Sequence, residues 1–390
     1  MEFEFTQEQE AFRNEVRQFI KRELPSELKW RNYYFDFYSH YDEVGNFTRV
    51  MSRKLGTKGW LSLTWPKKYG GQGASPIFQL ILQEELEYNH CPGIDIFGVT
   101  MIAPTLLKFA DEEQKEEHLP GIAKGEVFWC ECLSEPDAGS DLASPKTVAK
   151  EEDSSFVING QKVWTSGAHQ ADWAILLART SQELPKHRGL SFFLVDMKTP
   201  GISVNPLINM ANDHEFNEVF FEDVRVPKKN MVGDKNKGWY VVMTLLGFER
   251  WSIPFYAIAH RYLEDVINYA KQKKSLNPAL RYRLSELLIE CEVGRLLHYR
   301  IVWMQEKGEI LDYEAAAVKM YTTELNQRVA AASMEILGPY GILTKGSKWA
   351  YLDGEAAWNY LRCIGNSLEM GSSEIDRNII AMRGLGLPPG

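Results

Sequence analysis

A glutamate–arginine pair inside an apolar stretch is the pattern in this chain with the clearest chemical potential. Glu249 and Arg250 lie between Phe248 and Trp251, in a segment with few other polar side chains. Loss of solvent raises the pKa of a carboxyl group towards neutrality, which is the range useful to a general base. Pro254 cannot donate a hydrogen bond to the carbonyl of Arg250, so a helix that carries the pair must break or kink there. The pattern predicts a buried carboxylate at an interrupted helix, where a ligand can reach it.

A run of small residues follows a strand-like segment and is the second candidate site. Ser134, Ala138, Gly139 and Ser140 offer main-chain N–H groups and hydroxyls with little side-chain bulk, so a planar ring can approach closely. The sequence contains no GxGxxG fingerprint after a strand, no P-loop and no GxSxG motif. A Rossmann-type nucleotide site is therefore not expected.

The cysteines offer a weaker candidate for redox or metal chemistry. Cys130 and Cys132 are two residues apart, so in a strand their side chains share one face. The two readings are a redox or metal pair and a pair of buried strand thiols, and we favour the second. The five cysteines are an odd number, and no CxxC spacing occurs. Neither a disulfide scaffold nor a zinc site is expected.

Composition describes a folded protein and excludes several partner classes. Of the 390 residues, 44% are hydrophobic and 25% are charged. The 53 acidic and 44 basic side chains give a net charge of −9, which argues against nucleic-acid binding. The longest apolar run, Trp173 to Ala178, is far shorter than the roughly 20 residues of a membrane span. The start, Met1 to Phe5, is acidic and unlike a leader peptide, so a cytoplasmic location is expected.

The elements that must position these residues follow the order helical, β, helical. The first part of the chain is predicted to be helical, because its apolar residues recur at helical spacing. The predicted helices follow the capping box of Thr6 and Gln9 and lie at residues 47–55, 76–89 and 105–119. Strands are predicted at 156–164, 173–178, 190–195, 202–207 and 218–226. Helices return at 239–273, interrupted at Pro254, and at 284–305, 313–337, 355–363 and 373–383. Strands without intervening helices indicate an antiparallel sandwich or barrel.

One turn inside the β region has a strong local signal. Asn159-Gly160 separates Phe156-Val157-Ile158 from Gln161-Lys162-Val163-Trp164. Asn-Gly accepts the positive φ angles of a tight primed turn, so the string predicts a β-hairpin.

Seven strings, in order along the chain, resemble motifs of the acyl-CoA dehydrogenase family. The most specific is Cys132-Leu133-Ser134-Glu135-Pro136-Asp137-Ala138-Gly139-Ser140-Asp141, which is similar to the family's CxTEPGAGSD signature. The others are residues 65–71, 159–167, 216–221, 223–227, 336–338 and 373–380. The resemblance covers essentially the whole chain. It implies an α+β fold with an all-α domain at 1–122, a central antiparallel β sandwich or barrel domain at 123–234, and a four-helix-bundle-like domain at 235–390.

The resemblance also implies FAD as the cofactor. It places Leu133 and Ser134 at the pyrimidine edge of the flavin, and Trp164 beside the ring with Thr165 and Ser166 on its N5 side. Ser140 is expected near the cofactor phosphate and the CoA chain. The segment Glu335 to Gly338 resembles a loop that reaches the FAD of a neighbouring subunit. The other cofactor-binding residues implied are Cys132, Gly139, Ser372 and Glu374.

The family's reaction removes an α proton from an acyl thioester and passes the β hydrogen to flavin N5 as hydride, which requires a carboxylate base. Of the family's two base positions, the C-terminal one holds Met370 here, which cannot act as a base. The other matches Glu249, in the Glu-Arg pair found in isovaleryl- and long-chain-type enzymes. Glu369, one residue from the first position, and Asp95 are the rival candidates. Arg250, Ser140, Asp95 and Gly371 are expected to contact the substrate.

The resemblance therefore implies an oxidoreductase acting on the CH–CH bond of an acyl-CoA. Asp95, among Ile94, Ile96 and Phe97, is unusual for a pocket that holds a plain alkyl chain, so a bulky, branched or cyclic acyl group is expected. The alternatives are an acyl-CoA or nitroalkane-type oxidase and a non-catalytic subunit of a heteromeric enzyme. The expected partners are an electron-transfer flavoprotein and further subunits, in a homotetramer or a heterotetramer with a paralogue.

Overall fold

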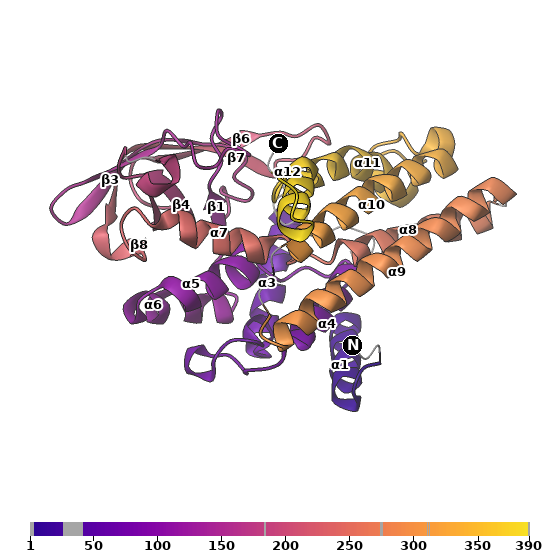
Figure 1. The fold of residues 1–390 in the computed structure, drawn as a ribbon. Helices are drawn as coiled ribbons and strands as arrows, with labels where there is room; N and C mark the ends of the chain where they lie inside the picture. Colours follow the sequence, from indigo (N-terminus) through magenta and orange to yellow (C-terminus); the bar gives the residue numbers. More distant parts are fainter. Residues whose placement is uncertain are drawn as a thin grey trace. The chain divides into compact units, whose positions relative to one another are not determined.

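The structure, a computed structural model, describes residues 4–25, 42–182, 185–273, 276–309, 311 and 313–388. Its internal contacts divide the chain into two compact units, each assembled from separated stretches (Figure 1). One unit comprises Met1–Tyr34, Ser75–Pro92 and Ile253–Gly390, and the other comprises Phe35–Ala74 and Gly93–Ser252. The predicted helical, β, helical order and the α+β class are confirmed. The domain boundaries at residues 122 and 234 stay predictions.

The second unit is built on an eight-stranded sheet, as far as the described residues show. The strand order is β6-β7-β3-β2-β4-β5-β8, with β1 beside β4. Their bounds are β1 Trp129–Cys132, β2 Val148–Glu151, β3 Ser155–Lys162, β4 Trp173–Arg179, β5 Leu190–Asp196, β6 Ile202–Leu207, β7 Phe216–Pro227 and β8 Met231–Val232.

The sheet is mixed rather than wholly antiparallel. β1 pairs with β4 in parallel along four residues, and β2 meets β4 in parallel at Val148 and Arg179. A parallel neighbour requires a long return connection, and β2 and β3 supply it between β1 and β4. The remaining pairs are antiparallel, as predicted.

The predicted hairpin at Asn159-Gly160 is wrong, because both residues lie inside the continuous strand β3. The register of β3 against β7 shifts between Ile158 and Gly160, which marks a β-bulge. The side-chain oxygen of Asn159 accepts the N–H of Asp223 at 2.9 Å, and its amide donates to the Asp223 carboxylate at 3.0 Å. The Asn-Gly pair therefore bends a strand that has a partner on each side.

Helices of the second unit are α3 (Asp42–Thr57), α5 (Ala103–Phe109), α6 (Glu112–Ala123) and α7 (Gly238–Glu249), with a π-helical segment η4 (Ile96–Ile102) before α5. The single helix predicted from Thr105 to Leu119 is wrong. Asp111 begins a new helix there, because its carboxylate and the side chain of Gln114 form a reciprocal capping box. η4 packs against α7 and β1, which brings three distant parts of the chain together.

The first unit is helical. It contains α1 (Gln7–Glu23), α4 (Pro76–Tyr88), α8 (Phe255–Gln272), α9 (Pro278–Glu306), α10 (Tyr313–Leu337), α11 (Glu355–Asn366) and α12 (Ser373–Ile379). α8, α9 and α10 pack against one another, and α11 packs against α10 (Figure 1). The predicted capping box at Thr6 and Gln9 is present. The predicted break is present as well: α7 ends at Glu249 and Pro254 caps α8.

The cysteines are buried thiols, as predicted. All five cysteines are free and buried, and Cys130 and Cys132 both belong to the apolar cluster on one face of the sheet. Within the same residues no cluster of side chains suits a metal ion. No helix there has the length and hydropathy needed to cross a membrane.

Candidate active site

Glu249 is the last residue of α7, and its side chain is only 7% exposed. The helix stops there because Ser252 closes it. The backbone N–H and the hydroxyl of Ser252 both donate to the Glu249 carbonyl, at 3.2 and 2.8 Å. Arg250 caps the helix and is half-buried. The predicted carboxylate is therefore buried at an interrupted helix, as the apolar flanks and Pro254 indicated.

Asp95 lies in the same unit and precedes η4. Its side chain is 2% exposed, and its Oδ2 accepts the backbone N–H of Trp129 at 3.0 Å. Burial raises the pKa of Asp95 to about 7, against the opposing effect of that hydrogen bond. Asp95 is thus a buried acid and not an exposed loop residue.

Glu131 is a third acid in this unit, and sequence reasoning missed it. Burial raises the pKa of Glu131 well above its usual range, and the charges of Glu249 and Asp95 raise it further. Glu131 therefore lies within the electrostatic reach of both Glu249 and Asp95. The available signal was a lone acid between two apolar cysteines in a predicted strand.

The predicted cofactor loop is anchored by a buried ion pair. Lys162 and Glu135 lie 2.8 Å apart with almost no solvent exposure. Lys162 also donates to the Leu133 carbonyl at 2.9 Å, and the N–H of Val163 donates to the Ser134 carbonyl at 2.9 Å. The backbone of Leu133 and Ser134 is therefore held in one position, which suits recognition of the edge of a planar ring.

The other residues of this loop differ in exposure. Gly139 and Ser140 are exposed, and a Cβ on Gly139 would meet no atom within 4 Å. Cys132 points into the apolar cluster of the sheet, so only its main chain is available to a cofactor.

Trp164 has the geometry of a ligand-facing residue. It adopts a positive φ of 59°, and its ring is 60% exposed and packs edge-on against Phe216. Thr165 follows with its main chain bonded to Asn217 in both directions, at 3.1 and 2.9 Å. The Thr165 hydroxyl is buried and lacks a hydrogen-bond partner among the described residues. An exposed indole, an unsatisfied hydroxyl and half-buried Ser166 fit a flavin ring.

The C-terminal site residues lie in the other unit. Glu369 accepts a hydrogen bond from the buried Arg362 at 3.0 Å, which occupies its Oε2. Met370 and Gly371 both have positive φ, at 57° and 89°, and Lys319 donates to the Gly371 carbonyl. Ser372 caps α12 by accepting the N–H of Ile375 at 3.3 Å, and Glu374 is exposed in its first turn.

The predicted intersubunit loop follows α10. The exposed side chain of Glu335 forms an ion pair with Arg283. Gly338 adopts a positive φ of 54°, and a Cβ on it would meet no atom within 4 Å. The described residues of this unit leave the space beside Gly338 free, so a neighbouring subunit can reach the segment.

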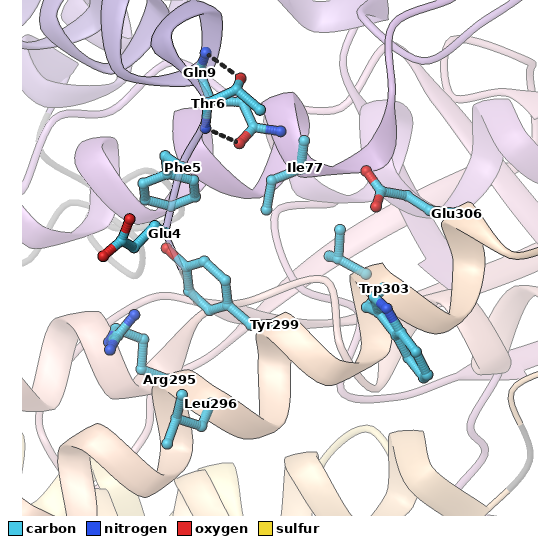
Figure 2. A pocket seen from close by; sticks show the side chains of 11 residues that line it. Glu4, Phe5, Thr6, Gln9, Ile77, Arg295, Leu296, Tyr299, Trp303 and Glu306 are labelled. Atoms are coloured by element: carbon cyan, nitrogen blue, oxygen red, sulfur yellow. Dashed lines mark hydrogen bonds between the residues drawn. The ribbon is translucent and has the colours of Figure 1, made fainter. Parts of the chain in front are cut away.

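A separate pocket of about 380 Å³ lies among α1, α4 and α9 (Figure 2). It is lined by Phe5, Arg295, Tyr299 and Trp303 together with neighbouring residues, and no predicted site residue contributes to it. The dashed bonds of Figure 2 are the capping box of Thr6 and Gln9 beside it.

Family models match nearly the whole chain. They are the N-terminal domain of acyl-CoA dehydrogenase at residues 6–126, the middle domain at 130–224 and the C-terminal domain at 236–385. The chain belongs to the acyl-CoA dehydrogenase family. It is therefore an enzyme of a family of flavoprotein oxidoreductases.

Individual relatives agree with this assignment. The acyl-CoA dehydrogenase FadE26 of Mycobacterium tuberculosis is 32% identical over 100% of this chain and 99% of its own length. FadE34 of the same organism is 35% identical over 86% of this chain, which corresponds to 45% of that longer protein.

Among solved structures, the Tcur3481-Tcur3483 steroid acyl-CoA dehydrogenase (ACAD) is similar with a TM-score of 0.91 and 32% identity. The ChsE4-ChsE5 complex of Mycobacterium tuberculosis follows with 0.89 and 32%. In both cases the match covers 100% of both chains.

Proposed function

We propose that this protein dehydrogenates the α,β bond of a bulky, ring-bearing acyl-CoA thioester, with Glu249 as the base and FAD as the cofactor. The observation that carries the proposal is the contrast between the two base positions. Glu249 is buried at the broken end of α7, whereas the alternative position holds Met370 and the adjacent Glu369 is bonded to Arg362.

The roles of the chain's own residues follow from this geometry. The buried Glu249 carboxylate takes the α proton, since a carboxylate with little hydration is a stronger base than one in water. FAD, when bound, supplies the acceptor for the β hydride. The anchored backbone at Leu133 and Ser134 would hold one edge of the flavin ring, and Trp164 and Thr165 would lie beside the ring. Arg250 and Ser140 are proposed to contact the CoA moiety.

The nature of the acyl group is inferred from two sources. The structure with a TM-score of 0.91 is titled a steroid ACAD, which supports a polycyclic or similarly bulky substrate. The acids Asp95 and Glu131 lie in the same unit as Glu249, and burying a carboxyl group beside a plain alkyl chain is costly because the group loses its hydration. Both features favour a ring-bearing acyl group over a linear fatty chain.

The proposed partners are an electron-transfer flavoprotein as acceptor and further subunits. The names of the two similar solved structures each contain two proteins, which supports a heteromer with a paralogue, and a homotetramer is the alternative.

The test is a panel of CoA thioesters mixed anaerobically with the FAD-loaded protein, with bleaching of the flavin absorbance as the readout. Cyclic acyl-CoA esters are expected to bleach it faster than linear ones. Rapid reoxidation by air of the substrate-reduced protein would instead indicate an oxidase. A folded chain that takes up no FAD on titration would indicate a non-catalytic subunit and overturn the proposal.

A further inference from the structure

The face of β1 opposite the sheet core carries polar atoms that the proposed chemistry does not use. Cys130 and Cys132 point into the apolar cluster, so the alternation of the strand turns Trp129 and Glu131 to the other face. That face packs against η4, and η4 packs against α7, whose last residue is Glu249. β1 therefore places Trp129 and Glu131 on the face that meets η4, and the charge of Glu249 acts on Glu131.

Asp95 joins this group through the start of η4. Its Oδ2 binds the backbone N–H of Trp129 at 3.0 Å. A Cβ on Gly98 would collide with that oxygen and would lie 3.1 Å from Cδ1 of the Trp129 indole. The nitrogen-bearing edge of the indole and the Asp95 carboxyl therefore both lie against Gly98, which has no side chain to separate them.

Three atoms of this group are buried without a hydrogen-bond partner in the described part of the chain. They are Oδ1 of Asp95, Oε1 of Glu131 and Nε1 of Trp129. Asp95 and Trp129 are only 2% and 1% exposed. Buried polar atoms in native proteins are almost always bonded, so three orphans in one place indicate a missing ligand group.

The hydrogen-bonding chemistry of these atoms indicates what that group is. The indole N–H is a donor only, whereas a carboxyl group accepts when it is ionised and can also donate when it is protonated. A ketone oxygen suits the indole and a protonated carboxyl, and a hydroxyl suits the indole and either form of the carboxyl. Burial raises the pKa of Asp95 to about 7 and the pKa of Glu131 well above its usual range, which favours the protonated form.

We propose that Glu131, Asp95 and Trp129 hydrogen-bond a ketone or hydroxyl oxygen of the acyl group, so that the enzyme selects an oxygenated acyl-CoA over the matching hydrocarbon. This inference rests on the proposed function and adds specificity-determining residues to it. A site built to bond an oxygen rejects the analogue that lacks it, because its own polar groups are then left unpaired.

The test compares the CoA thioester of cyclohexylpropanoic acid with a set of ring ketones that differ in the position of the oxygen. The readout is kcat/KM for anaerobic flavin reduction by the FAD-loaded protein. The wild type is expected to prefer at least one ketone by about tenfold or more. Glu131→Met is expected to abolish that preference while hydrocarbon turnover persists. Glu131→Gln, which keeps a neutral hydrogen-bonding group, is expected to retain most of it. Glu222→Met, on the exposed side of β7, is the matched control.

Each outcome has one reading. No bleaching with any thioester defeats the proposed function itself. Bleaching without preference in the wild type, or an unchanged preference in Glu131→Met, overturns this inference and leaves the function intact. Equal loss in the Gln and Met variants, with preference for an amine-bearing acyl group, would mean that a cation is bound and would also overturn it. If Glu131→Met fails to bind FAD, the inference is judged from the substrate preference of the wild type and of Glu131→Gln.

Discussion

Two glutamates stand at or beside the family's base positions, and their surroundings differ. Glu249 ends α7 with 7% exposure, whereas Glu369 has one oxygen bonded to Arg362 at 3.0 Å. The burial of Glu249 at the broken end of α7 favours this residue as the base, and replacing each glutamate separately tests the choice.

Glu249→Gln should lower the rate of substrate-dependent flavin reduction by about 10²- to 10⁴-fold, the usual contribution of a general base. The amide keeps the shape of the side chain, so binding of FAD and of a product-like CoA ester should persist. Stopped-flow absorbance measures the rate, with Glu369→Gln as the matched control and a much smaller loss expected there. A wild-type rate in Glu249→Gln, together with abolished reduction in Glu369→Gln or Asp95→Asn, would contradict the assignment.

The buried Asp95 predicts a pH-dependent stability. An unfolded aspartate loses its proton near pH 4, whereas the folded one, with a pKa of about 7, keeps it longer. As the pH rises from 4 to 7, the carboxyl therefore destabilises the fold increasingly, by up to about 4 kcal/mol. Burial is the cause that raises the Asp95 pKa, whereas the backbone N–H groups of Trp129 and Gly98 and the charge of Arg49 oppose the shift.

Asp95→Asn should thus gain stability relative to the wild type between pH 5 and pH 8, and the gain should grow with pH. Urea unfolding followed by tryptophan fluorescence at several pH values measures it. Asp141→Asn is the control, since this exposed carboxylate bonds Lys186 at 2.7 Å and should show no trend in that window. A gain that is constant across the window would refute the assigned pKa.

At the β-bulge in β3, pairing with neighbouring strands overrides the turn preference of the local Asn-Gly sequence. Asn-Gly favours a tight turn between two strands, but β3 has β2 on one side and β7 on the other. The Asn159 side chain is bonded to Asp223, and Gly160 has a φ of 154° with Thr147 close by. Gly160 therefore allows the backbone of β3 to pass close to Thr147, where a larger side chain would collide.

Gly160→Ala should lower the free energy of unfolding by about 1 to 3 kcal/mol, because a Cβ there collides with Thr147. Denaturant unfolding of the apoprotein measures the change. Gly247→Ala in α7 is the control, since its Cβ would enter open space and alanine favours a helix. Equal stability of both variants and the wild type would mean that the strand relaxes around the added methyl.

At the scale of the whole molecule, the segment after α10 bears on assembly. Gly338 has a positive φ and no atom near its missing Cβ, and Glu335 is exposed and paired with Arg283. The resemblance of the sequence to the family predicts that this segment completes the cofactor site of a neighbouring subunit. We therefore expect a tetramer, formed by this chain alone or with a paralogue.

Light scattering of the FAD-loaded protein should give four times the mass of one chain if this chain assembles alone. If a paralogue is required, the isolated chain should bind FAD poorly, and co-expression with the paralogue should restore both the mass and the yellow colour. A stable monomer with full FAD occupancy would contradict the expectation.

The sequence by itself determined the order of helical and β segments, the capping box at Thr6, the break before Pro254 and the family motifs. These follow from side-chain period and turn chemistry, which depend on neighbours along the chain. Only the tertiary structure decided that Glu131 lies near Asp95 and Glu249, that Asn159-Gly160 bends a strand, and that β1 runs parallel to β4. Those features depend on partners that are distant in the sequence. No local sequence pattern specifies which strand pairs with another or which acidic residues lie close together.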